Sequence, residues 1–247
     1  MPAEGILTID KFLICSALGA GQCRAMACNP EHRDLKFLPW ANVAAHLTRN
    51  GKSPPNAKGN AFCFLPLPAE PGFAVHINGY FELSANRRDI WHGSDMTGAG
   101  QVRSEWNRLL LWDVISPLYT QVLLAARELI GPGEDFNRLW PTRISSDIWK
   151  VVRSRVSQLS ENLPLMHTPK LGGNWVSIKS AVFLDYDNDA EGKSSSSALS
   201  LTKKKLLDIL LQENLNIVTI SSSIVKCMKD EACKGNGVSP HFVRQWY

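Results

Sequence analysis

Residues 60–91 read NAFCFLPLPAEPGFAVHINGYFELSANRRDIW, and this stretch decides the fold of the 247-residue chain. Two apolar, strand-like stretches within it, residues 61–67 and 73–83, predict two strands. The proline-rich residues 66–72 between them predict a stiff loop. The segment therefore predicts two strands that form a rigid base for the charged loop that follows.

Hydrophobic periodicity predicts further elements around this segment. Residues 6–17 predict a strand, and residues 39–47 predict a short amphipathic helix with Val43, Ala44 and Leu47 on one side. Residues 48–59, which include two prolines, predict an exposed loop. The longest periodic segment, residues 103–130, predicts a core helix whose apolar stripe is Trp106, Leu110, Val114, Leu118, Val122, Ala125 and Leu129.

Pro117 lies inside that helical segment. Its ring removes the hydrogen bond to the carbonyl of Asp113, which predicts a kink or a break into two helices. We therefore predict an α+β fold, in which residues 1–131 form a domain with a mixed β-sheet packed against a long kinked helix.

Residues 132–247 predict a second domain, a smaller helix-rich α/β lobe. Helices are expected over residues 147–163, 199–215 and 224–233, with Asp147 as a candidate cap of the first. Strands are expected over residues 175–184 and 217–220, and a last helical turn is expected to open at Ser239 and Pro240. Residues 185–197 are acidic and serine-rich, which predicts a mobile loop.

Composition argues against several classes of partner. The formal charge of +4 comes from 27 basic and 23 acidic residues, and residues 203–205 form the one basic run, so a nucleic-acid face is not expected. No stretch approaches the roughly 18 consecutive apolar residues of a membrane span. Six cysteines and the lack of a signal-peptide pattern predict a reducing, cytoplasmic location.

Two segments imitate ligand-binding motifs. Cys23, Cys28 and His32 form a C-x4-C-x3-H pattern, but no fourth ligand is near, and Cys227 and Cys233 would have to fold back to supply one. Residues 93–100, GSDMTGAG, offer glycines to an anion but match no standard phosphate motif. We expect free thiols without a metal, and a flexible connection before the long helix.

Three stretches together carry a family resemblance: FCFLPLP, VHINGYFELSANRRDIW and SEWNRLLLWDVISPLYTQVLL. The residues that define these motifs are Phe64, Pro66, Pro68, Asn78, Gly79, Trp91, Trp106 and Asn107. From about Phe12 to its end, the chain resembles the sacsin family in the form found in plants. Sacsins are very large chaperone-like proteins with repeated modules, each opening with an ATPase domain of the superfamily of gyrase, heat-shock chaperones, histidine kinases and MutL. The chain resembles the part that follows this ATPase domain, which implies a fold like a chaperone middle domain.

The resemblance also implies what the chain lacks. The superfamily holds ATP with a helical Asn, an Asp-x-Gly-x-Gly loop and a glycine-rich lid, and residues 95–100, DMTGAG, imitate the second of these at the wrong spacing. We therefore expect no enzyme activity of its own and no cofactor, with ATP-magnesium entering only through a partner ATPase domain. Asn86, Arg87 and Arg88 then become candidate phosphate-sensing or partner-contact residues. The alternative is that the arginines form surface salt bridges, for instance with Glu82 or Asp89.

The sequence leaves three functions open. The first is a non-catalytic chaperone or co-chaperone fragment, acting in protein folding or quality control through a sacsin-type ATPase domain, a heat-shock chaperone system or client proteins. The second is an ATP-binding enzyme that uses residues 93–100, and the third is a poorly folding truncated relative. Departures from the family pattern at Ala41, Asn42, Ala74 and Trp112 count against full activity, and an exposed Trp112 would form an apolar patch.

Overall fold

The computed structural model describes residues 7–55, 58–93, 97–184, 215–218, 220–233 and 241–243. The chain forms two compact units, Met1–Val156 and Ser157–Tyr247. Residues 132–156 thus fall within the first unit, although the sequence placed a domain boundary after Gly131. The predicted loop at 185–197 and all but the last residue of the helix predicted at 199–215 lie outside the described residues.

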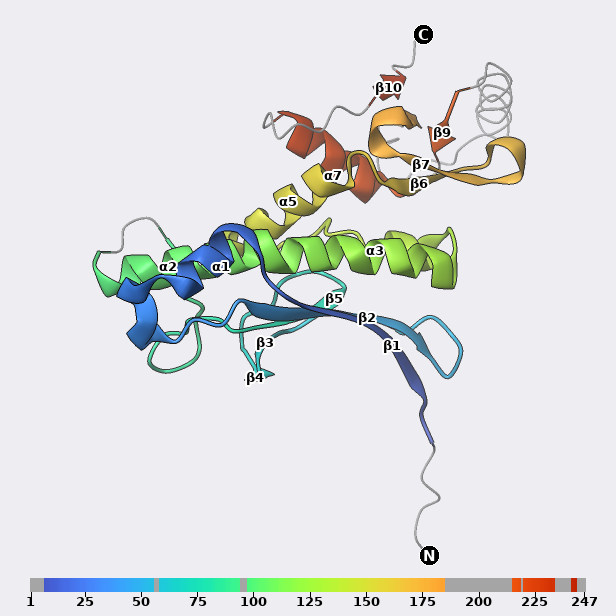
Figure 1. Cartoon of the computed structure of the whole chain (residues 1–247). Helices are drawn as coiled ribbons and strands as arrows, with labels where there is room; N and C mark the ends of the chain where they lie inside the picture. Colours follow the sequence, from blue (N-terminus) through green and yellow to red (C-terminus); the bar gives the residue numbers. More distant parts are fainter. Residues whose placement is uncertain are drawn as a thin grey trace, which may run out of the picture. The chain divides into compact units, whose positions relative to one another are not determined.

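The first unit is built on a five-stranded mixed sheet with the order β1-β2-β5-β3-β4 (Figure 1). Its strands are β1 (Asp10–Leu18), β2 (Trp40–Arg49), β3 (Ala61–Cys63), β4 (Leu65–Pro66) and β5 (Val75–Gly79). Strand β2 pairs antiparallel with both β1 and β5, whereas β3 runs parallel to β5. The sequence therefore placed β1, β3 and β5 correctly, and the mixed α+β class is confirmed.

The helix predicted over residues 39–47 is wrong, because this segment is strand β2. Ala41, Val43, Ala45 and Leu47 are buried, whereas the residues between them are partly exposed. This alternation has the period of two that a strand requires. Strand β2 also lies between β1 and β5, so its backbone groups find partners on both sides, a tertiary effect that no local pattern encodes.

One long helical segment lies along one face of this sheet (Figure 1). It consists of α2 (Ala99–Leu110), a π-helical turn η2 (Leu111–Ile115) and α3 (Ser116–Ile130). The helix is not divided at Pro117, because the backbone keeps helical dihedral angles from Leu110 to Ser116. A π-turn lies just before the proline instead, and in it the N–H of Ser116 reaches back five residues to the carbonyl of Leu111. Ala99–Ile130 is long and apolar enough to cross a membrane, but 67% of its most apolar stretch is buried in the structure, as expected of a core helix.

The apolar stripe predicted for the helix is confirmed over most of its length. Trp106, Leu110, Val114, Leu118 and Val122 are buried as predicted, but near the end of the helix Ala125 is only half-buried and Leu129 is 62% exposed. Beyond the π-turn the buried face is wider than the stripe, because Tyr119, Leu123 and Ala126 are buried as well.

Shorter elements complete the first unit: α1 (Gly21–Cys28), η1 (Pro30–Leu35), α4 (Glu134–Asn137), η3 (Asp147–Trp149) and the start of α5 (Lys150–Ser160). The Phe73 ring packs edge-on against Tyr119 and Trp149, which places residue 149 in the same core. Asp147 is not the helix cap that the sequence predicts, because its carboxylate pairs with Lys150 at 2.6 Å and Ser146 holds the N-cap position.

Trp112 does not form the exposed apolar patch expected from the sequence. Its side chain is half-buried, and the guanidinium of Arg155 on α5 lies 4.7 Å from the ring centroid. This cation–π contact covers the ring from within the unit.

The second unit holds two small sheets. Strands β6 (Pro164–Thr168) and β7 (Asn174–Ser177) pair antiparallel, and β8 (Val182–Leu184) lies between β9 (Ile217–Val218) and β10 (His241–Val243) in a parallel sheet. The strand predicted over residues 175–184 is divided by the 3-10 turns η5 (Ile178–Ser180), which Ser177 caps. A turn η4 (Lys170–Gly172) precedes β7, and helix α7 (Ser222–Cys233) confirms the helix predicted there. The helical turn predicted at the end of the chain is wrong, because residues 241–243 pair with β8 as a strand.

Candidate functional site

The candidate site is built on a short hairpin of residues 82–91, here called the arginine hairpin. Leu83 and Ile90 form an antiparallel β-bridge, and the backbone N–H of Trp91 donates to the carbonyl of Glu82 at 3.1 Å. The indole Nε1 of Trp91 also donates to the carbonyl of Leu83 at 2.8 Å. The two arms are thus joined at the base, close to where β5 ends.

The tip of the arginine hairpin is shaped by its own side chains. The Oδ1 atom of Asn86 accepts a hydrogen bond from the Ser84 hydroxyl at 2.7 Å and one from the backbone N–H of Arg88 at 3.0 Å. Arg87 has a φ of 56°, in the left-handed region, and its N–H donates to the carbonyl of Ser84 at 2.8 Å. The Asn86 side chain therefore fixes the turn, and both arginines are exposed at its tip.

Both arginines are exposed, and neither forms an ion pair with any residue that the structure describes. The salt bridge with Glu82, offered by the sequence as an alternative, is absent because Glu82 pairs with Arg103 on α2 at 3.1 Å. Burial is the main cause that raises the pKa of Glu82, and the charge of Arg103 opposes it. The arginine hairpin thus presents two exposed guanidinium groups that form no ion pair with the described residues.

Helix α2 clamps the base of the arginine hairpin through Asn107, whose side chain is completely buried. Its Nδ2 donates to the carbonyls of Glu82 at 2.8 Å and Trp91 at 2.9 Å, and its Oδ1 accepts from the N–H of Glu82 at 2.9 Å. The neighbouring Trp106 donates its Nε1 hydrogen to the carbonyl of Tyr80 at 2.9 Å. One side chain thus holds both arms of the hairpin, and the residues that defined the sequence motif build its support.

The other motif residues shape the sheet next to the hairpin. Phe64 adopts a φ of 60°, and its N–H donates to Oδ1 of Asn78 at 3.0 Å, so Asn78 stabilises a turn that non-glycine residues rarely adopt. The Phe64 ring is 59% exposed and stacks on Trp40 with centroids 5.8 Å apart. A Cβ atom on Gly79 would lie 3.2 Å from Cδ2 of Leu110, so this position brings β5 close to the helix.

The two motif prolines lie in the connection that follows β3. Pro66 and Pro68 are exposed on either side of Leu67, which is buried and whose N–H donates to the carbonyl of Ala61 at 2.9 Å. They stiffen the connection between β3 and β5.

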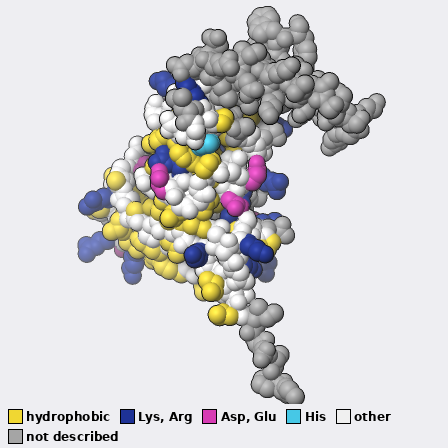
Figure 2. All heavy atoms as spheres, turned by 90° about the vertical axis from the view of Figure 1, so that its right-hand side faces the viewer, with side chains coloured by type: hydrophobic (Ala, Val, Ile, Leu, Met, Phe, Trp, Pro, Cys, Tyr) yellow, Lys and Arg dark blue, Asp and Glu magenta, His cyan; other side chains and the backbone are white. Residues whose placement is uncertain are grey.

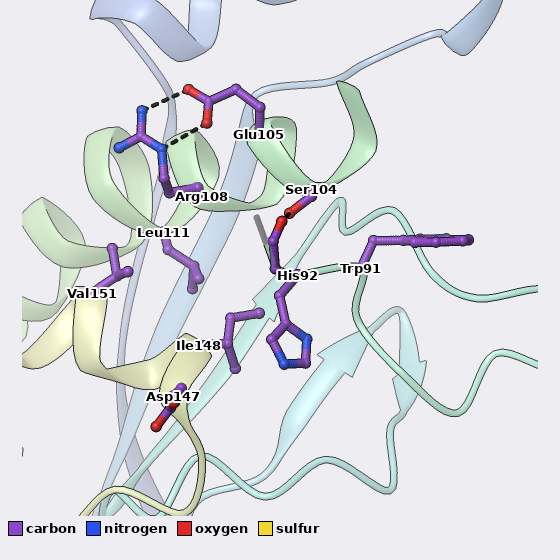
Figure 3. A pocket seen from close by; sticks show the side chains of 10 residues that line it. Trp91, His92, Ser104, Glu105, Arg108, Leu111, Asp147, Ile148 and Val151 are labelled. Carbon is purple, nitrogen blue, oxygen red and sulfur yellow. Dashed lines mark hydrogen bonds and ion pairs between the residues drawn. The ribbon is translucent and has the colours of Figure 1, made fainter. Parts of the chain in front are cut away.

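A pocket of about 360 Å³ lies beside the base of the arginine hairpin, between helix α2 and the start of α5 (Figure 3). Its lining is mostly apolar, and the side chains of Glu105 and Arg108 at its rim form two hydrogen bonds of 2.6 and 2.7 Å. The residues that line it are Trp91, His92, Gly93, Ser104, Glu105, Arg108, Leu111, Asp147, Ile148 and Val151. The sequence did not predict this pocket, because its walls come from two segments, residues 91–111 and residues 147–151, that are far apart in the chain.

The segment that leaves the hairpin is fixed against this pocket. The Nδ1 atom of His92 lies 2.9 Å from the carbonyl of Ile90, and since a carbonyl only accepts, this nitrogen carries the hydrogen. The hydroxyl of Ser104 donates to the carbonyl of Gly93 at 3.0 Å.

Two segments imitate ligand-binding motifs, and the structure describes the first of them fully and the second in part. Cys23 is buried, and burial, with the charge of Asp113, raises the pKa of its thiol to about 12. Across the described part of the chain, no three His, Cys, Asp or Glu side chains gather closely enough to hold a metal ion. Of the glycine-rich residues 93–100, residues 94–96 lie outside the described part, and Gly98 holds the N-cap position of α2 without a side-chain cap.

Fold and site together define an α+β module with a helix-clamped arginine hairpin. In sequence the chain is similar to human sacsin, with 28% identity over 244 residues that cover 86% of this chain. This similarity supports a sacsin-like family for the chain, as the sequence motifs predicted. The chain spans only about 5% of the length of human sacsin. No family model and no solved structure matches the chain.

Proposed function

We propose that the chain is a non-catalytic, sacsin-like module of a molecular chaperone or co-chaperone, which acts in protein folding or quality control by contacting an ATPase domain. The observation that carries the proposal is the arginine hairpin, whose Arg87 and Arg88 are exposed and form no ion pair with described residues. On this proposal the first unit corresponds to a chaperone middle domain.

The chemical reason lies in phosphoryl transfer. Negative charge develops on the transferred phosphoryl group and its leaving oxygen, and an arginine supplied by a second domain stabilises it. Such an arginine is effective only when its position is fixed before the reaction, because ordering it later would cost free energy. The buried Asn107 and the tip residue Asn86 fix the backbone that carries Arg87 and Arg88, so fewer degrees of freedom remain to be ordered when the guanidinium groups meet a phosphate.

The proposal includes the surroundings in which the module acts. ATP-magnesium is bound by the partner ATPase domain and by no site of this chain. The module works in the cytoplasm, with a sacsin-type ATPase domain or a heat-shock chaperone system as its partner and client proteins as further ligands. Neither nucleic acid nor a membrane takes part.

The test is to measure ATP turnover by an isolated sacsin-type ATPase domain with and without the chain. We expect the chain to raise turnover, and Arg87→Ala or Arg88→Ala to remove the increase. Arg33→Ala is the matched control, since Arg33 is equally exposed, forms no described ion pair and lies outside the hairpin. If the chain does not raise turnover, or if all three variants act alike, the proposal is wrong.

A further inference from the structure

The five-stranded sheet of the first unit ends in two different edges. The edge at β4 is two residues long and contains Pro66, which has no backbone N–H to donate. Short strands and prolines are common means by which proteins keep a sheet edge from pairing with another chain. The edge at β1 has neither feature, because this strand is nine residues long and contains no proline. Of the two edges, β1 is therefore the one that is open to pairing.

The free edge of β1 presents a row of backbone groups. The N–H of Gly19 donates to the carbonyl of Pro39, next to β2, and the register between β1 and β2 is regular from Phe12 to Leu18. Residues of an antiparallel strand direct their backbone groups alternately toward the neighbouring strand and away from it, so the odd-numbered residues before Gly19 face β2. No described strand lies on the other side of β1. The N–H and C=O groups that face this free edge belong to the even-numbered residues Phe12, Ile14, Ser16 and Leu18.

Exposed apolar side chains are concentrated along the same strand. Nine large apolar side chains are exposed in the described part of the chain, and five of them lie between residues 7 and 18. Figure 2 shows hydrophobic side chains on the surface where the described chain begins. These five side chains are Leu7, Ile9, Phe12, Ile14 and Leu18.

Charged side chains protect only the beginning of this edge. Asp10 is already bound to Arg49 at 2.8 Å and to His46 at 2.7 Å, and the register of the strand shifts between Lys11 and Phe12. Residues 12–18 carry no charge. A charged segment paired with this stretch would therefore lose hydration without gaining an ionic partner. The edge requires an extended, uncharged and largely apolar strand that has a free edge of its own.

Among the described strands, β1 is the one that meets this requirement. Strands β2, β3 and β5 have a neighbour on both sides, and β4 is short and contains a proline. The strands of the second unit are at most five residues long. Two copies of one edge can pair antiparallel about a two-fold axis, so that the same groups of both copies meet.

We propose that β1 pairs antiparallel with β1 of a second copy of this chain, which joins two five-stranded sheets into one. The backbone groups of residues 12–18 then find partners, and the side chains of Phe12, Ile14 and Leu18 lose exposure to water. A pairing of seven residues is smaller than a standard interface, so the dimer is weak and forms at high concentration. The arginine hairpin takes no part in it.

The experiment is sedimentation equilibrium of the full chain in the presence of a reducing agent, which excludes a dimer joined through cysteines. We expect the average mass to rise from the 27.4 kDa of one chain toward about twice that value. The rise should occur as the concentration increases from about 1 µM to about 500 µM.

Two variants test the side chains and the backbone of the edge separately. Ile14→Lys brings two like charges together and should weaken association at least about tenfold, whereas Leu129→Lys adds the same charge on α3 and should not. Ile14 and Leu129 are matched in exposure, at 60% and 62%. Ser16→Pro removes an N–H that faces the free edge, a position where strands tolerate proline, and should also weaken association. Ser16→Ala keeps this N–H and should associate as the wild type does.

The outcomes also separate this proposal from the ATPase experiment, because Arg87→Ala should associate as the wild type does. A single-chain mass at the highest concentration overturns the proposal. Equal association of Ile14→Lys and Leu129→Lys overturns it as well, because the contact then lies elsewhere. Undiminished association of Ser16→Pro, with a wild-type circular dichroism spectrum, shows contact without strand pairing and overturns it too.

Discussion

Asn107→Ala is the substitution that tests the architecture of the site most directly. The alanine removes three hydrogen bonds, two to Glu82 and one to Trp91, at a position with no solvent exposure. Each such bond contributes about 0.5–1.5 kcal/mol, and a buried N–H left without a partner costs about 1–3 kcal/mol. Because the Glu82 carbonyl keeps its bond from the N–H of Trp91, we expect a net loss of about 3 kcal/mol.

The loss of stability should be confined to the arginine hairpin, so the assay should measure the opening of the hairpin itself. The chain has two compact units, and a global melt would mix their transitions. Amide hydrogen exchange of Trp91 is the better measure, since its cross-hairpin bond to Glu82 survives the substitution and reports opening of the hairpin. A local loss of about 3 kcal/mol corresponds to exchange about a hundredfold faster.

Two controls make this result interpretable. The Ile77 amide, which donates to the Asn60 carbonyl in the sheet, should exchange as in the wild type. Asn86→Ala removes two hydrogen bonds at the exposed tip and should change Trp91 exchange much less. If Asn107→Ala accelerates Trp91 exchange by less than about fivefold, or accelerates Ile77 equally, the clamp described for α2 is refuted.

Three further predictions follow. Gly59→Ala should lower the free energy of unfolding of the first unit by about 3 kcal/mol or more in urea, because the new Cβ would lie 1.7 Å from the Val75 carbonyl oxygen. Gly51→Ala is the control: its Cβ would meet open space, so we expect a loss of about 1 kcal/mol. Burial lowers the pKa of His76 below 6.5, and its Nδ1 accepts a hydrogen bond from the N–H of Asn60. The free energy of unfolding should therefore fall as pH drops below about 6.5, and His76→Gln should make this dependence on pH less steep. Calorimetry with millimolar ATP-magnesium should give no saturable heat with the chain alone, and a saturable signal would favour the enzyme alternative.

The sign of the pH prediction follows from proton binding. Between pH 6.5 and the lower pKa of the folded protein, His76 binds a proton only when the chain is unfolded. Stability therefore rises with pH across this window and is fully present above pH 6.5. A slope that His76→Gln leaves unchanged would assign the effect to another group, such as His167, whose pKa burial also lowers.

Local patterns were sufficient where an element is determined by its own residues. The strand content of residues 61–83 and the long apolar period that ends at Ile130 predicted β3, β5 and the core helix. Pro117 predicted an irregularity, and a π-turn lies just before it in an otherwise continuous helix, because a missing N–H acts at one fixed position whatever surrounds it. The motif residues Trp106 and Asn107 were also identified from the sequence, but their hydrogen bonds to Tyr80, Glu82 and Trp91 were not predicted.

Tertiary structure decided the elements whose local signal was ambiguous. Residues 40–49 carry small and polar residues that fit either period, and pairing with β1 and β5 made them a strand. Beyond Ser116 the buried face also takes in Tyr119 and Leu123, which lie beside the predicted Leu118 and Val122. Residues 132–156 joined the first unit because Trp149 packs with Phe73, a contact across 76 positions of sequence.

The sequence by itself determined the mixed α+β class, the similarity to sacsin and the presence of two adjacent arginines after a strand. It could not show that Asn107 holds both arms of the hairpin, that Glu82 is already paired with Arg103, or that a pocket opens beside Trp91. The physical reason is the separation along the chain of the residues that set each property. Strand propensity, proline geometry and motif identity are properties of neighbouring residues, whereas a buried clamp, a neutralised charge and a cavity depend on residues that meet only after the chain has folded.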